Sequence, residues 1–108
     1  MGNKKAMISQ PMRGLSDEEI LKTRNRIAEK LEKLGYEVID TFFSDEYRDK
    51  DQLEALGIKN IPVAFLAKSL ESMATVDCVC FAAGWEENRG CRIEHSVAKE
   101  YGIEMQFE

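Results

Sequence analysis

The sequence lacks the features that mark membrane, secreted and fibrous proteins. It has only two prolines and seven glycines among 108 residues, which excludes a collagen-like or low-complexity chain. No run approaches the roughly 20 apolar residues of a membrane-spanning helix, and the segment 1–5 lacks the apolar region of a signal peptide. We therefore expect a cytoplasmic protein with no membrane partner.

The sequence is also poor in residues that bind metals. His95 is its one histidine, and its three cysteines are an odd number. Cys78 and Cys80 alternate with apolar residues in what reads as a buried strand, and free cysteine is among the most buried residue types. We predict that Cys78, Cys80 and Cys91 are small core residues, and we expect no metal and no other cofactor.

An excess of positive charge is absent as well. Fifteen basic residues stand against 20 acidic ones, giving a formal net charge of −5. Such a field repels phosphodiester backbones, so we do not expect nucleic acid as a partner. What is present is an ordinary globular composition, 44% hydrophobic and 32% charged, with a length typical of one domain, which we assign to residues 1–108.

Short apolar runs alternate with helical patterns along the chain. The patterns predict strands at 4–9, 36–43, 77–83 and 103–107, and helices at 16–34, 62–75 and 90–100. Ser16 and Glu19 form a capping box at the start of the first helix. The strongly polar segment 44–60 predicts an exposed loop with room for one helical turn.

Strands that alternate with helices predict a parallel sheet with right-handed crossovers. The expected fold is α/β, a flavodoxin-like three-layer sandwich with a four-stranded parallel sheet of order 2-1-3-4 and helices on both faces. In that order the first and third strands are neighbours whose connections leave on opposite faces. Open α/β sheets bind ligands at such a switch point. We therefore expect a site between the loops 10–14 and 84–90.

Glu94 is the leading candidate for chemistry at this crevice. It follows Gly90 near the start of the last predicted helix. The helix dipole there should favour the ionised carboxylate, which makes Glu94 a candidate nucleophile or base. Acidic residues also occur in first helical turns for purely structural reasons, so the spacing alone leaves both interpretations open.

The first loop and the third strand add further candidates. Arg13 and Gly14 precede the first helix, where a guanidinium and main-chain N–H groups can hold an anion such as phosphate. A solvated arginine is the alternative. Asp77, at the start of the third strand, could bind a sugar hydroxyl or satisfy local backbone donors.

The second loop adds an aromatic and two cations. Trp85 could stack on a planar base or lock the loop onto the domain. Arg89 or Arg92 could pair with Glu94 or with a bound anion. His95 should point away from Glu94, because consecutive helical residues do not face each other, and we interpret it as structural.

These residues carry a resemblance to a known family. The segment 7–14, the strand that begins at Asp77, and Gly84-Trp85 followed by 89–98 resemble the small nucleoside 2-deoxyribosyltransferase-like domains of bacteria and their phages. The resemblance covers nearly the whole chain except 44–60. Among the characterised relatives are deoxyribosyltransferases and deoxynucleoside 5'-monophosphate N-glycosidases.

The resemblance implies that Glu94 attacks the anomeric carbon of deoxyribose and forms a glycosyl-enzyme intermediate. It also implies that the loop at Pro11 lines the pocket, that Arg13 approaches a phosphate, and that the protein is a homodimer or a higher homo-oligomer. We take Glu94 and Asp77 as candidate catalytic residues. The candidate substrate-binding residues are Ser9, Pro11, Met12, Arg13, Gly14, Gly84, Trp85, Arg89 and Gly90.

Two positions depart from the enzymes. Met7 stands where they carry tyrosine, and Ser69 stands where they carry aspartate, eight residues before Asp77. Neither side chain exchanges a proton at neutral pH as a carboxyl group can, so Glu71, Asp77 or a residue of a second subunit would assist departure of the base.

The sequence thus leaves three hypotheses. The first is an N-glycosidase or deoxyribosyltransferase that acts on a 2'-deoxynucleoside or its 5'-monophosphate. The second is a non-catalytic module that binds a nucleotide or nucleotide-sugar in the same crevice. The third is an oligomeric scaffold with no small ligand.

Overall fold

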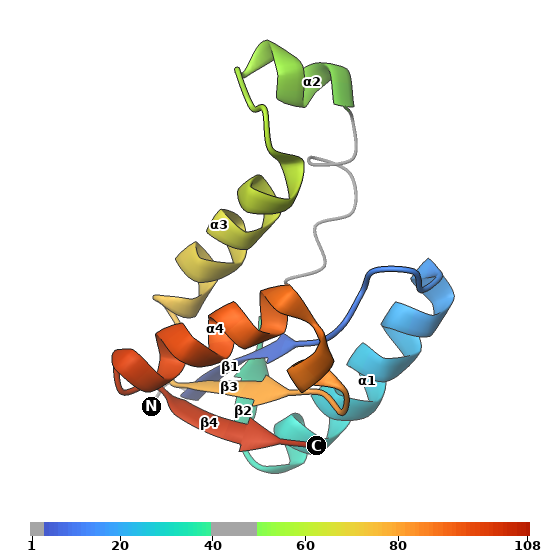
Figure 1. The fold of residues 1–108 in the computed structure, drawn as a ribbon. Helices are drawn as coiled ribbons and strands as arrows, with labels where there is room; N and C mark the ends of the chain where they lie inside the picture. The colour runs from blue at the N-terminus through green and yellow to red at the C-terminus, as the bar shows by residue number, and fades with distance from the viewer. Residues whose placement is uncertain (1–3, 40–49) are drawn as a thin grey trace.

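The structure, a computed structural model, describes residues 4–39 and 50–108. Four parallel strands form one sheet in the order β2-β1-β3-β4. Helix α1 covers one face, while α4 and the C-terminal end of α3 cover the other (Figure 1). The predicted flavodoxin-like α/β sandwich with a 2-1-3-4 sheet is confirmed.

The elements follow the predicted alternation of strands and helices. In chain order they are β1 (Lys4–Ser9), α1 (Asp17–Lys33), β2 (Tyr36–Val38), α2 (Lys50–Ala55), α3 (Ile61–Met73), β3 (Cys78–Phe81), a 3-10 turn at Trp85–Glu87, α4 (Arg89–Glu100) and β4 (Glu104–Phe107). The predicted end of the second strand at 40–43 and the polar residues 44–49 lie outside the described residues. The rest of the polar segment includes the short helix α2. None of the described helices is long and apolar enough to cross a membrane.

The first helix begins where its cap predicts. The side-chain oxygen of Ser16 accepts a hydrogen bond from the backbone N–H of Glu19 at 3.1 Å, as in an N-capped helix. Three acidic residues occupy the first turn and two lysines the last, which complements the helix dipole. Gly35 ends the helix with a φ of +94°, which glycine adopts without strain.

Alternation along the strands divides the core into two layers. Ile8 and Cys80 face α1, whereas Met7, Val79 and Phe81 face α3 and α4. All three cysteines are free and buried, as predicted. The same alternation turns Ser9, two residues after Met7, toward the α4 side of the sheet.

Helix α3 is apolar but largely uncovered. Asn60 caps it by accepting the N–H of Val63 at 3.1 Å, and Pro62 lies in its first turn. Of its 13 residues only Met73 is buried, and Val63 is 57% exposed. Figure 1 shows the helix rising away from the sheet, so that its N-terminal half stands clear of the core.

Glu108 connects the end of β4 to α1 and to the loop after β3. Its carboxylate accepts a hydrogen bond from Arg26 Nε at 2.8 Å and from the N–H of Ala83 at 3.0 Å. The hydrogen bond from Arg26 is the largest cause of a pKa lowered from the ordinary carboxyl value. This contact holds the loop that leads to Gly84.

We expect Glu108→Gln to lower the Tm by a few degrees at pH 7, because the charge that pairs with Arg26 is lost. A lowered folded-state pKa stabilises the protein above the unfolded pKa, and this stabilisation disappears as pH falls through the folded value. The difference between variant and wild type in thermal melts should therefore shrink as pH falls below the ordinary carboxyl pKa and disappear once Glu108 is protonated in the folded protein. Glu104→Gln, at the start of β4, is the control. Equal Tm values of Glu108→Gln and wild type at pH 7 would show that the contact of Glu108 with Arg26 does not stabilise the protein.

Candidate functional site

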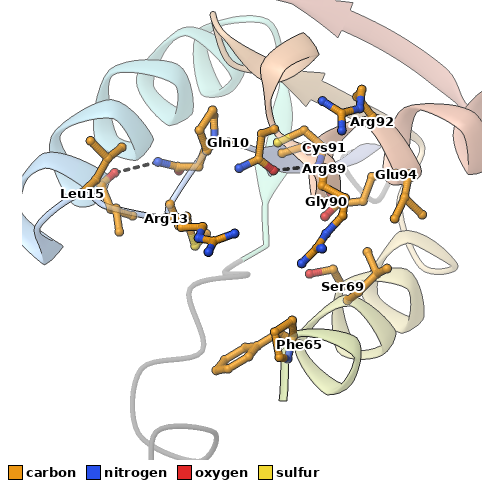
Figure 2. Close-up of a pocket in the computed structure, with 18 of the residues that line it drawn as sticks. Gln10, Arg13, Leu15, Phe65, Ser69, Arg89, Gly90, Cys91, Arg92 and Glu94 are labelled. Atoms are coloured by element: carbon orange, nitrogen blue, oxygen red, sulfur yellow. Dashed lines mark hydrogen bonds between the residues drawn. The ribbon is translucent and has the colours of Figure 1, made fainter. Parts of the chain in front are cut away.

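An open groove lies at the predicted switch point, beside the carboxyl ends of β1 and β3. Its volume is about 1450 Å³. One wall comes from the loop after β1 and the start of α1, a second from α3, and a third from the loop after β3 and the first turns of α4 (Figure 2). The expected location of the site therefore coincides with an open groove.

Glu94 forms part of this groove from the second turn of α4. Asn88 starts the helix, because its Oδ1 accepts the N–H of Cys91 at 3.0 Å. Cys91, Glu94 and Ala98 then follow at helical spacing and are all buried against the sheet. Glu94 is only 9% exposed, and no cation of residues 4–39 and 50–108 pairs with its carboxyl group.

Burial gives Glu94 an unusual carboxyl group. Loss of solvation raises its pKa from 4.5 to about 6, and proximity to Ser9 lowers it by less. The expectation that the helix dipole would favour the ionised form was wrong in its net direction. Glu94 lies beyond the first turn, where the dipole has fallen off, and burial outweighs what remains. A carboxyl of this kind titrates close to neutrality, as catalytic carboxyl groups often do.

This shift has a measurable consequence for stability. A raised folded-state pKa stabilises the protein below the unfolded value near 4.5, and that contribution is lost as pH rises through about 6. From pH 4 to pH 8, Glu94→Gln should therefore gain about 2 kcal/mol in free energy of unfolding relative to wild type. Urea titrations at several pH values measure the difference. If the free energy of unfolding differed between Glu94→Gln and wild type by the same amount at every pH, the Glu94 carboxyl would be solvated.

Two arginines reach into the groove from facing walls. Arg13 follows β1 and Arg89 begins α4, and Figure 2 shows their side chains directed toward the same opening. Neither makes an ion pair or a side-chain hydrogen bond with any residue in the described part of the chain. Arg92 differs, because its guanidinium donates to the backbone carbonyl of Glu86 at 3.0 Å. Arg13 and Arg89 are therefore available to an anionic ligand, and neither Arg89 nor Arg92 neutralises Glu94.

The structure gathers most of the predicted residues at the groove. Its lining includes Ser9, Pro11, Met12, Arg13, Gly84, Arg89, Gly90 and Glu94. Gly14 turns the chain with a φ of +80° but does not line the groove.

Asp77 was wrongly placed at the site. It precedes β3, and its Oδ2 accepts the backbone N–H of Lys5 at 2.8 Å. All strands run parallel, so the start of β3 lies at the opposite edge of the sheet, roughly 15 Å from the groove along the strand. Asp77 therefore satisfies a local backbone donor, which was the alternative interpretation.

Trp85 also does not line the groove. Its ring stacks on His95 with centroids 4.4 Å apart and packs beside Phe81 at 5.4 Å. Trp85 thus locks the loop onto the domain instead of facing a ligand. His95 is half-buried in the same cluster, which agrees with its interpretation as structural.

Several groove residues were not among the predicted substrate-binding residues. Gln10 is buried, and its Nε2 donates to the carbonyl of Ile20 at 3.0 Å. Phe65 and Ser69 come from α3, whose position the local pattern does not reveal. Of the two positions that the expected resemblance singled out, Ser69 lines the groove, whereas Met7 is buried in the core.

Comparison with known proteins yields a family but no relative of known activity. No curated protein and no solved structure matches the chain. In residues 4–39 and 50–108, no three histidine, cysteine, aspartate or glutamate side chains are grouped so as to hold a metal ion. One family model, described as a domain of unknown function, DUF4406, matches residues 4–107, from the first strand to the last. The chain therefore belongs to the DUF4406 family.

Proposed function

We propose that this protein cleaves or transfers the N-glycosidic bond of a 2'-deoxynucleoside or its 5'-monophosphate, with Glu94 as the nucleophile. One observation carries the proposal: a buried carboxyl group, with no cationic partner among residues 4–39 and 50–108, forms part of an open groove at the switch point of the sheet. The resemblance to deoxyribosyltransferase-like domains, in which the matching glutamate attacks the sugar, supplies the reaction.

In the proposed reaction, a Glu94 carboxylate oxygen attacks C1' as the bond to the base breaks. The base leaves with the electron pair of that bond and takes up a proton. Water or a second base then attacks C1', gives up a proton to the group that protonated the first base, and releases the carboxylate, so that the configuration at C1' is retained.

The proton for the departing base needs a different source from the one that the sequence suggested. Asp77 lies at the opposite edge of the sheet, and Glu71 is not part of the groove lining. Glu87 lines the groove and has no side-chain partner among the described residues, so it replaces them as the candidate donor. Water and a second subunit are the other sources.

The two arginines that face the groove favour the 5'-monophosphate over the nucleoside. A guanidinium can donate two parallel hydrogen bonds to a phosphate, and such charge-assisted bonds are among the strongest in proteins. Arg13 also lies just before α1, where it can act together with main-chain N–H groups.

We expect Arg13→Ala to raise the KM for 5'-monophosphates by about 10- to 100-fold, the range that corresponds to losing a hydrogen bond to a charged group. The KM for the matching nucleoside should stay within about twofold, because the nucleoside carries no phosphate. Arg92→Ala is the matched control, since its guanidinium already bonds to the Glu86 carbonyl. An equal loss for nucleoside and nucleotide would contradict the phosphate role.

The activity itself is tested with a panel of 2'-deoxynucleosides and their 5'-monophosphates, with and without an acceptor base. Chromatography follows the release of free base and the formation of new nucleosides. We expect release that depends on Glu94. Release no greater than that of Glu94→Ala, across the whole panel, would reject the enzyme.

A second candidate is a nucleotide-binding or nucleotide-sugar-binding module without turnover. Ser69 on the groove wall and Met7 in the core favour it, because the enzymes carry aspartate and tyrosine at these positions. Calorimetry separates the two candidates. Nucleotide binding by both wild type and Glu94→Gln, without base release by wild type, would support the binding module.

We also propose that the protein forms a homodimer or a higher homo-oligomer. The uncovered apolar residues of α3, which include Val63, are the surface that supports this. Light scattering coupled to size-exclusion chromatography tests it, and a monomer at high concentration would reject it.

A further inference from the structure

The Ser9 hydroxyl is a buried polar group without a hydrogen bond to any described residue. Ser9 ends β1 and is 2% exposed, and its Oγ has no partner of hydrogen-bond geometry in the described part of the chain. Its carbonyl, by contrast, accepts the N–H of Ala82 at 2.9 Å. Buried polar atoms in proteins are nearly always satisfied, so an exception points to a role beyond packing.

The surroundings of this hydroxyl contain two titratable groups. The Cys91 thiol and the Glu94 carboxyl, one turn apart on α4, lie beside Ser9 at the groove. Neither reaches hydrogen-bond geometry, yet proximity to Ser9 lowers the pKa of both against the larger effect of burial. A thiol is a weak acceptor, whereas an ionised carboxylate is a strong one.

The charged side chains of the groove do not shift the pKa of Glu94. Arg13, Arg89 and Arg92 line the groove, as do Asp17 and Glu87, and none of these five contributes to the pKa shift of Glu94. Among the side chains of the described residues, Ser9 is the one whose interaction lowers the pKa of Glu94.

We propose that Ser9 is a positioning residue for Glu94. When the carboxyl group ionises, the Ser9 hydroxyl turns and donates a hydrogen bond to one carboxylate oxygen, which leaves the other oxygen directed into the groove. While Glu94 is protonated, the Ser9 hydroxyl makes no hydrogen bond to it. The role in catalysis rests on the proposed function, but the hydrogen bond itself does not.

The first test measures the ionisation of Glu94 without any substrate. Carbon-13 NMR follows the Glu94 carboxyl through a pH titration in wild type, Ser9→Ala and Ser9→Thr. We expect the Glu94 pKa to rise by about one unit in Ser9→Ala, a tenfold change in the ionisation equilibrium, and to return toward wild type in Ser9→Thr. Ser96→Ala is the matched control, because Ser96 lies on the exposed side of α4 and donates to the Arg92 carbonyl at 3.1 Å.

An identical Glu94 pKa in wild type and Ser9→Ala would overturn the proposal. The variant should fold at least as well as wild type below pH 5, where Glu94 is protonated and the deleted hydroxyl has no partner. A Ser9→Ala protein that fails to fold at that pH would also overturn it.

The second test separates this proposal from the proposed function. If base is released, Ser9→Ala should lower kcat about tenfold at pH 5 and little above pH 8, with KM unchanged, because only the ionised fraction changes. If wild type releases no base while the Glu94 pKa still depends on Ser9, the glycosidase fails and the hydrogen bond stands. If the pKa does not depend on Ser9, the positioning role fails even in an active enzyme.

Discussion

Glu94→Gln should lower the rate of base release by at least about 10³-fold, as expected when a covalent nucleophile is removed. An amide has nearly the shape of the carboxyl but cannot form the glycosyl ester. Nucleotide binding should change little, because Arg13 and Arg89, which we expect to hold the phosphate, stay in place. The effect should therefore fall on kcat and not on KM.

Glu87→Gln is the variant for comparison, since Glu87 also lines the groove but is proposed to protonate the base and not to attack the sugar. It should slow departure of the base without abolishing covalent attack, and its loss should be largest for the poorest leaving groups. Glu94→Gln with more than a tenth of the wild-type rate would show that another group attacks the sugar.

Phe81→Ala should destabilise the protein by about 3–5 kcal/mol, the range for truncating a buried aromatic residue. Phe81 is 0% exposed, and its ring packs against Trp85 at 5.4 Å, His95 at 5.4 Å and Phe107 at 5.5 Å. This aromatic cluster joins β3 and β4 to the loop after β3 and to α4. Because small domains are stable by only about 5–15 kcal/mol, the Tm should fall by more than about 12 °C.

Phe107→Ala separates burial from ring contact. Phe107 stacks on Phe81 but is 48% exposed, so it should lose less than half as much stability in urea denaturation. A Phe81→Ala protein within about 1 kcal/mol of wild type would mean that the cluster is dispensable for positioning α4.

The topology was predictable because short-range patterns determine it. Apolar runs that alternate with helical patterns predict a parallel sheet with right-handed crossovers. The N-cap residue Ser16 likewise predicts where α1 begins. Once the strand order is known, the switch point places Arg13 and Glu94 at one groove without any knowledge of side-chain contacts.

The expectations for Trp85 and Glu94 were wrong because tertiary contacts determine the surroundings of both side chains. Trp85 has the chemistry to stack on a base, but His95 and Phe81 offer it a ring cluster inside the domain. The helix dipole argument for Glu94 considered the backbone alone, whereas burial depends on how α4 meets the sheet. Asp77 is a different kind of error. The direction of β3 alone was sufficient to show that Asp77, at the start of the strand, lies at the edge of the sheet opposite the groove.

The packing of α3 beside the groove left no local signal in the sequence. Phe65 and Ser69 reach the groove only because α3 crosses beside α4, a matter of packing between segments distant in the sequence. Asn88, by contrast, did carry a local signal, since asparagine just before a helical pattern is a common N-cap. Its position at the start of α4 was therefore available from the sequence.

The most direct test is a crystal structure with a 2'-deoxynucleoside 5'-monophosphate analogue whose base is joined to the sugar through carbon, so that it cannot leave. We expect C1' within about 3.5 Å of a Glu94 carboxylate oxygen, the separation of a near-attack geometry, with the phosphate between Arg13 and Arg89. An analogue bound in the groove with its sugar out of reach of Glu94, or bound elsewhere on the protein, would contradict the proposed reaction.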